Sequence, residues 1–255
     1  MTIDFEKGEV LIIDKPYEWT STDVVRKLKN AIRKKTGVAK FKIGHAGTLD
    51  PLATGLLVVC VGKKTKEIEK FQAEKKEYTG IITVGATTPS YDLETPIEKT
   101  FDVSDITDEK IKTAAHSLEG EQLQTAPLYS AKKIDGQRAY ELARKGETPE
   151  IKSHLITIFR FEITEIKMPD IYFRVECSKG TYIRTLASDL GKKLNNGAYL
   201  RELRRTVNGD FKVENAYLLE KILQNLSVDD QPVELISSIG PDQNSRFNTC
   251  SKYCP

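Results

Sequence analysis

The chain has few cysteines and no long apolar run. Its four cysteines, at positions 60, 177, 250 and 254, are too few and too scattered for a disulfide scaffold. No stretch of about 18 apolar residues could cross a membrane as a helix, and residues 1–6 lack the pattern of a signal peptide. These absences exclude a disulfide-rich secreted domain and a helical membrane protein. We expect a protein of the reducing cytoplasm.

Motifs for metals and nucleotides are also missing. The three histidines are dispersed, and Cys250 with Cys254 would supply half a zinc site at most. The glycines between Gly44 and Gly55 match neither the dinucleotide fingerprint nor a P-loop. No order of serine, histidine and aspartate suggests a hydrolytic triad. We therefore expect neither a metal nor a cofactor.

Charge is unevenly distributed along the 255 residues, although the net charge is only +2. Eight lysines and arginines, and no acid, lie between Arg26 and Lys42, and further basic groups lie at 132–145 and 201–205. One such cluster alone is often only a solvated face. Three clusters around a near-neutral remainder indicate a surface for a polyanion.

Strand and helix patterns are mixed without a regular repeat. They predict strands at 8–14, 77–84, 159–166, 171–177, 200–207 and 210–213, and helices at 20–36, 63–73, 107–120, 181–190 and 218–223. We expect an α+β fold with a central mixed, mostly antiparallel sheet flanked by helices. Residues 1–223 form its one domain, with an exposed inserted segment at about 123–152, and 224–255 form a short tail.

The most distinctive stretch runs from Gly44 to Leu57, where three glycines and Pro51 surround Asp50. Glycine permits positive φ and close backbone approach, and a proline disfavours helical conformation in the residue before it. The apolar run that follows is typical of a central strand. A carboxylate held in this way is either a turn-forming residue or a positioned reactive group.

Several segments, taken in order, resemble one known family. Residues 44–55 resemble the catalytic motif of the TruB family of tRNA pseudouridine synthases. Further matches are Lys15-Pro16 with Thr20-Ser21, Lys76 with Tyr78, 127–144, 177–184 and 203–209. The resemblance spans about residues 8–213 and implies the pseudouridine synthase fold. It also implies isomerisation of uridine 55 in the tRNA T loop to pseudouridine, without a cofactor.

The resemblance assigns the catalytic roles. Asp50 is the essential carboxylate, which attacks the base or the sugar or helps to form a glycal; the sequence leaves these open. Arg184 is its cationic partner, since an opposite charge nearby favours the ionised form. Tyr78 stacks on the target base and could act as base at the sugar, although a tyrosine in a strand is more often core.

The same resemblance assigns substrate-binding residues. His45 packs where the flipped nucleotide leaves its stack. Tyr182 and Leu203 line the pocket and exclude water. Asp92 is a structural or RNA-contacting residue, and the inserted segment grips RNA through basic side chains. These are Lys132, Arg138 and Arg144.

The chain departs from the family in two places. Glu18 stands where the N-terminal motif usually has glycine, and residues 224–255 are too few for a full C-terminal RNA-binding (PUA-type) module. We expect Lys15 and Pro16 to brace the central loop.

We predict an isomerase that acts as a monomer on the T arm of tRNA, with no membrane and no obligatory protein partner. One alternative is a guide-RNA-dependent pseudouridine synthase subunit. Another is a non-catalytic tRNA-folding or tRNA-binding factor. A glycoside hydrolase would need a second carboxylate placed near Asp50, and no motif in the sequence supplies one.

Overall fold

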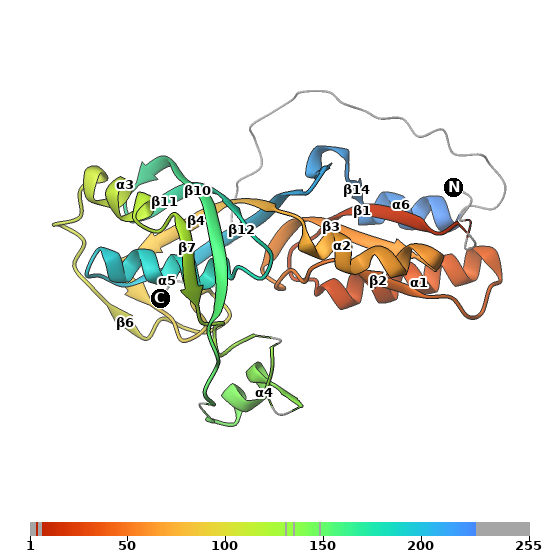
Figure 1. Ribbon diagram of the computed structural model, residues 1–255, viewed down its shortest axis with the longest axis horizontal. Coiled ribbons are helices and arrows are strands. Elements are labelled where there is room, and N and C mark those ends of the chain that lie inside the picture. Colours follow the sequence, from red (N-terminus) through yellow and green to blue (C-terminus); the bar gives the residue numbers. More distant parts are fainter. Residues whose placement is uncertain (1–3, 5–6, 131, 135, 148, 228–255) are drawn as a thin grey trace.

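The computed structural model describes residues 4, 7–130, 132–134, 136–147 and 149–227. A ten-stranded mixed sheet forms its centre (Figure 1). The strands of this sheet are β1 (Glu9–Lys15), β2 (Ile43–His45), β3 (Ala53–Val61), β4 (Lys76–Val84), β7 (Gly120–Gln124), β10 (His154–Lys167), β11 (Asp170–Cys177), β12 (Ala198–Asn208), β13 (Phe211–Lys212) and β14 (Tyr217–Leu218). Two short hairpins are separate from it, β5 (Ala86–Thr87) with β6 (Lys99–Thr100) and β8 (Lys133–Ile134) with β9 (Gln137–Arg138).

The sheet confirms the expected mixed, mostly antiparallel topology. Its main order is β14-β1-β3-β12-β4-β11-β10-β7, with β2 paired to β3 and β13 to β12. The pairs β1–β14 and β3–β12 are parallel, and the other pairs of this sheet in the described residues are antiparallel. Strand β12 joins the two halves, because it pairs with β4 along its length and with β3 only over Leu203–Arg205. The site described below lies at this junction.

Helices cover each half of the sheet over its own core. The helical elements are α1 (Ser21–Thr36), η1 (Gly62–Glu67), α2 (Ile68–Ala73), α3 (Asp108–His116), α4 (Ala139–Arg144), α5 (Ile183–Lys193), η2 (Val213–Asn215) and α6 (Leu219–Ser227). One core lies between β1, β3, α1 and α6, and another between β4, β10, β11, β12, α3 and α5. On the other face of β1 and β3, Ile68 and Phe71 of α2 pack on Val58 and Cys60.

Local sequence explains where helix α1 begins and ends. Thr20 caps its N-terminus and forms a capping box with Asp23, and Gly37 ends the helix in the left-handed region at φ 69°. The helix buries one apolar face against β1 and β3. That face consists of Val24, Leu28 and Ile32.

Several boundaries differ from the sequence prediction. Helix α3 ends at His116, and Gly120 begins β7 rather than ending the helix. The segment after β3 begins as the 3₁₀ helix η1 before α2. The expected domain end at residue 223 falls inside α6, which continues to Ser227 and buries Leu226 at 3% exposure. The rest of the expected tail, 228–255, lies outside the described residues.

The inserted segment connects β7 to β10 and carries β8, β9 and α4. Figure 1 shows α4 well apart from the main sheet, as the sparse apolar pattern predicted. None of the helices in the described ranges is long and apolar enough to span a bilayer.

Candidate active site

Buried side chains hold the backbone on both sides of Asp50. The Ser21 hydroxyl accepts a hydrogen bond from the Leu49 N–H (2.9 Å) and donates to the Leu49 carbonyl (3.2 Å). On the other side, Lys15 Nζ donates to the Pro51 carbonyl at 3.3 Å. The loop that carries Asp50 is therefore fixed by side chains from β1 and α1.

Lys15 braces this loop, in agreement with the expectation from sequence. Its side chain is fully buried, and Nζ also donates to the carbonyls of Pro16 (2.9 Å) and Trp19 (2.6 Å). Burial lowers the pKa of Lys15 to about 8. Glu18 has a left-handed backbone, φ 65°, and donates its N–H to the Pro51 carbonyl at 2.9 Å. That conformation explains why glycine is the usual residue of this motif at position 18.

Asp50 and Arg184 lie together, as the resemblance implied. Arg184 Nε lies 2.9 Å from Asp50 Oδ2, but the N–H is not aligned for a hydrogen bond, so the contact is a charge pair. The Asp50 side chain is 38% exposed, whereas that of Arg184, in the first turn of α5, is 3% exposed. Arg184 Nη1 also donates to the carbonyls of Tyr129 (2.9 Å) and Ser90 (3.3 Å). A buried cation thus holds a carboxylate that remains accessible.

Asp92 contacts the same guanidinium. Its Oδ2 lies 3.5 Å from Arg184 Nε, and its Oδ1 accepts a hydrogen bond from the Glu94 N–H at 2.9 Å. The residue is 5% exposed, and burial raises its pKa although the charge of Arg184 opposes the shift. Asp92 does not line the pocket that contains Asp50. Its place favours the structural role over the RNA-contacting one.

The pocket around Asp50 has a volume of about 900 Å³. Its lining includes Tyr78, Tyr182, Leu203 and Lys132, which the sequence had assigned to the site. Tyr78 is 7% exposed, and burial raises its pKa.

Gln124 and Lys152 anchor two of the lining residues. The amide of Gln124 bonds both backbone groups of Tyr182, accepting from its N–H (2.8 Å) and donating to its carbonyl (3.1 Å). Burial raises the pKa of the Tyr182 phenol. Lys132 Nζ donates to the Lys152 carbonyl at 2.8 Å. Gln124 was not expected from the sequence, where it is one of two glutamines in a weak strand pattern.

Three other predicted residues are not placed in this pocket. His45 ends β2 half-buried and outside the lining, and in the described part of the chain its Nδ1 has no hydrogen-bond partner. Burial lowers the pKa of His45. Arg138 and Arg144 belong by their backbone to β9 and α4, and their side chains lie outside what the structure describes.

Only part of the expected basic surface at 201–205 is present: the side chains of Arg201 and Arg204 are 46% and 40% exposed, but Arg205 is buried. Arg205 is 1% exposed, and it donates from Nε to the Leu56 carbonyl (2.7 Å) and from Nη2 to the Gly47 carbonyl (3.1 Å). Arg204 pairs with Asp14 and Arg201 pairs with Asp170, so all three arginines are engaged within the protein. Alternation along a strand could have placed Arg204 and Arg205 on opposite faces.

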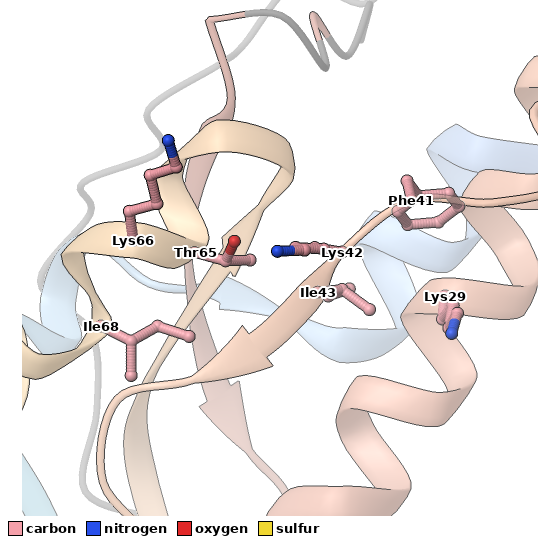
Figure 2. Close-up of a pocket in the computed structure, with 7 residues that line it drawn as sticks. All are labelled: Lys29, Phe41, Lys42, Ile43, Thr65, Lys66 and Ile68. Atoms are coloured by element: carbon pink, nitrogen blue, oxygen red, sulfur yellow. The ribbon is translucent and has the colours of Figure 1, made fainter.

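A second hollow, of about 620 Å³, lies between α1, the start of β2, η1 and α2. Figure 2 shows that three lysines from different segments surround it: Lys29, Lys42 and Lys66. Its lining holds no acid, and within the described ranges none of these lysines forms an ion pair. Helix α2 connects the two sites, since Ile68 lines this hollow and Gln72 lines the pocket of Asp50.

Comparison with solved structures defines the class. A chain in the crystal structure of a Cbf5–Nop10–Gar1 complex aligns with 86% of this chain at 30% identity and a TM-score of 0.65. This chain spans about half (54%) of that chain. A second neighbour comes from the structure of an H/ACA RNP bound to a substrate RNA containing 2′-deoxyuridine. It aligns with 84% of this chain at 27% identity and a TM-score of 0.62, and the alignment covers 52% of that neighbour. The fold is that of the pseudouridine synthases.

Sequence comparison identifies the family. Residues 33–183 match the N-terminal domain of the TruB family pseudouridylate synthases, and 184–239 match the tRNA pseudouridylate synthase B C-terminal domain. The tRNA pseudouridine synthase B of Flavobacterium johnsoniae is 54% identical over 225 residues, 87% of this chain and 98% of the relative. The tRNA pseudouridine synthase B of Phocaeicola vulgatus is 49% identical over 232 residues, which are 91% of this chain and 98% of that relative. The chain belongs to the TruB family.

Proposed function

We propose that the protein converts uridine 55 in the T loop of tRNA to pseudouridine, with Asp50 as the reactive carboxylate. The observation that carries this proposal is the pairing of an accessible Asp50 with a buried Arg184 at 2.9 Å inside a pocket. The relatives with about half their residues identical are named tRNA pseudouridine synthase B, and the matches cover nearly their whole length.

The reaction breaks the N-glycosidic bond, turns the uracil, and joins its C5 to the sugar, with loss of the C5 proton and uptake of a proton at N1. The Asp50 carboxylate can attack the base or the sugar, or stabilise positive charge that develops at the sugar. Arg184 holds that carboxylate in place and stabilises its charge. Apolar surface from Leu203 and the Tyr182 ring limits the access of water to an intermediate.

The environment of Tyr78 supports stacking rather than proton abstraction. Because burial raises its pKa above the ordinary value of 10.0, the phenol is neutral near pH 7. A neutral phenol is a poor base, whereas the buried ring offers a flat face to a base extruded from the loop. We therefore assign Tyr78 to holding the target uracil.

Lysines in the pocket and beside it supply the charge for tRNA binding. Lys132 lines the pocket of Asp50, and the hollow between α1 and α2 adds three ammonium groups that form no ion pair with any described residue. Phosphates are the natural partners of such lysines, and each contact makes binding weaker as salt rises. The role of His45 at the flipped nucleotide rests on the resemblance, because the residue lies outside the lining of the Asp50 pocket and its Nδ1 is buried.

The enzyme acts alone, as a monomer in the cytoplasm, in our proposal. The solved neighbours sit in complexes named for several components, but this chain spans only about half of those chains. The curated relatives that it matches over nearly their full length are named as single enzymes. The two cysteines in the described chain, Cys60 and Cys177, are buried free thiols, which suits a reducing compartment.

A glycoside hydrolase remains disfavoured on geometry. The structure does place a second carboxylate near Asp50, contrary to the expectation from sequence, because Asp92 contacts the same guanidinium. Asp92 is buried and lies outside the pocket lining, so it cannot reach a sugar bound beside Asp50. The two carboxylates therefore do not flank a substrate bond as a hydrolase requires.

The decisive experiment incubates a T-arm transcript with the purified chain and maps pseudouridine through its carbodiimide adduct. Asp50→Asn should abolish the adduct at position 55 while tRNA binding is retained. Asp170→Asn removes a carboxylate from another arginine pair, outside the pocket, and should leave activity intact. Full activity of Asp50→Asn would refute the assignment. If the wild-type chain binds tRNA without converting uridine 55, a binding factor is favoured. If it converts uridine 55 only when a guide RNA is added, the guide-RNA-dependent enzyme is favoured.

A further inference from the structure

The side chain of Arg205 packs against the loop that carries Asp50. Its guanidinium donates to the carbonyls of Gly47 (3.1 Å) and Leu56 (2.7 Å), which lie on either side of Asp50 in the sequence. It also interacts with the hydroxyl of Tyr78, from the neighbouring strand β4. One buried side chain therefore contacts both ends of the loop and the ring assigned to the target base.

Two glycines of the loop fit this arginine closely. A Cβ on Gly47, at φ 104°, would lie 3.3 Å from Arg205 Nη1. A Cβ on Gly55, at φ 98°, would lie 2.3 Å from the Arg205 carbonyl oxygen, a distance that real contacts essentially never show. The backbone of Arg205 thus requires glycine at position 55, and its side chain leaves little room for a Cβ at position 47.

The charge of Arg205 is held without a carboxylate. Among the residues that the structure describes, no acid lies within ion-pair distance of its guanidinium. Burying a cation without an ion pair costs free energy, and only carbonyl dipoles and the Tyr78 hydroxyl offset that cost here. The charge acts on the site around it, since it contributes to the lowered pKa of Lys15 and of His45. A core built for stability alone would not retain such a group.

We propose that Arg205 is a positioning residue of the isomerisation, which holds the Asp50 loop and the Tyr78 ring in one fixed relation. This inference rests on the proposed function, because the reaction at Asp50 is its main readout. A guanidinium suits the task because its planar fork presents several N–H groups in fixed directions. A lysine has no N–H at the position of Nε, so it would lose the bond that Nε donates to the Leu56 carbonyl.

The test compares Arg205→Lys and Arg205→Gln with Arg201→Lys, a matched change on the same strand, whose partner is Asp170 on β11. Single-turnover rate at saturating enzyme, tRNA Kd and hydrogen exchange of peptide 44–57 are measured where circular dichroism shows each variant folded. Arg205→Lys should react about 10- to 100-fold more slowly, as misplaced catalytic groups do, with Kd within about twofold. Exchange should rise in peptide 44–57 alone, and Arg201→Lys should match the wild type in all three measurements.

Three results would overturn the proposal. A single-turnover rate of Arg205→Lys within about twofold of wild type would show that the position is not set by the guanidinium. A raised Kd with an unchanged saturated rate would make Arg205 an RNA contact on the pocket floor. Failure of both Arg205 variants to fold would make it a folding residue. An inactive wild type would instead refute the proposed function, and the exchange of peptide 44–57 would still decide whether Arg205 holds the loop.

Discussion

Arg184 lies between two carboxylates of unequal exposure, with its Nε 2.9 Å from Asp50 and 3.5 Å from Asp92. Asp50 reaches the pocket, while Asp92 is buried behind the guanidinium. The buried carboxylate stabilises the orientation of the arginine, and the arginine in turn places the accessible one. This relation links the stability of the protein to the geometry of its site.

Loss of Arg184 should therefore reduce both activity and stability. Arg184→Gln leaves Asp92 as a buried carboxylate without a cation, which should lower the free energy of unfolding by about 3–5 kcal/mol. The single-turnover rate should fall by at least about 100-fold, since Asp50 loses the charge that holds it. Urea unfolding and the carbodiimide assay measure the two effects.

The double variant Arg184→Gln/Asp92→Asn separates the two effects. Neutralising Asp92 should restore part of the lost stability and none of the lost activity. Equal stability of the single and double variants would contradict the role assigned to Asp92.

Gly55→Ala should disrupt folding far more than Gly37→Ala. Both glycines have positive φ, at 98° and 69°, but a Cβ on Gly37 meets nothing within 4 Å, whereas one on Gly55 meets the Arg205 backbone. The left-handed conformation alone costs an alanine about 1–2 kcal/mol, and the clash should raise the cost at Gly55 above about 3 kcal/mol. Similar urea midpoints for the two variants would show that β3 and β12 separate easily at this point.

The lowered pKa of Lys15 predicts that the protein becomes more stable as the pH rises into the alkaline range. Its pKa is lowered in the folded protein from 10.5 to about 8, so below pH 8 both states hold the proton and the full penalty of burying the charge applies. Between pH 8 and 10.5 the unfolded chain binds the proton more tightly, so the free energy of unfolding increases with pH. Relative to Lys15→Met, the wild type should gain on the order of 3 kcal/mol across this range, measured by urea unfolding at each pH. A difference independent of pH would contradict the burial of a charged Lys15.

Lys42 and Lys66 should contribute to tRNA affinity rather than to chemistry. Each change to alanine should weaken binding and lower the slope of log affinity against log salt by about one, as expected for one lost phosphate contact. The single-turnover rate at saturating enzyme should not change. Arg201→Ala, which removes an arginine already paired with Asp170, serves as the control and should leave the slope unaltered. Unchanged slopes for both lysine variants would show that tRNA does not reach this hollow.

Local spacing predicted the elements and the motif around Asp50. Thr20 and Gly37 delimit α1 through capping rules that involve only neighbouring residues, and the apolar run after Pro51 predicts β3 in the same way. The catalytic assignment of Asp50 and Arg184 came from the order of the family motifs. Nothing local in the sequence relates these two side chains, which are far apart along the chain.

Pairing between distant strands decided the rest. The basic cluster at 201–205 has the composition of an RNA surface, yet Arg205 is buried because β12 lies beside β3 and its guanidinium meets the carbonyl of Leu56, 149 positions away. Likewise, Asp92 contacts Arg184 because helix α5, which carries Arg184, packs on the sheet. By itself the sequence indicated most of the elements, the family and the carboxylate that we propose as reactive, because periodicity, caps and motif order are local properties. Which cations face solvent and which support the site was decided only by the tertiary structure, because burial depends on contacts between segments far apart in the chain.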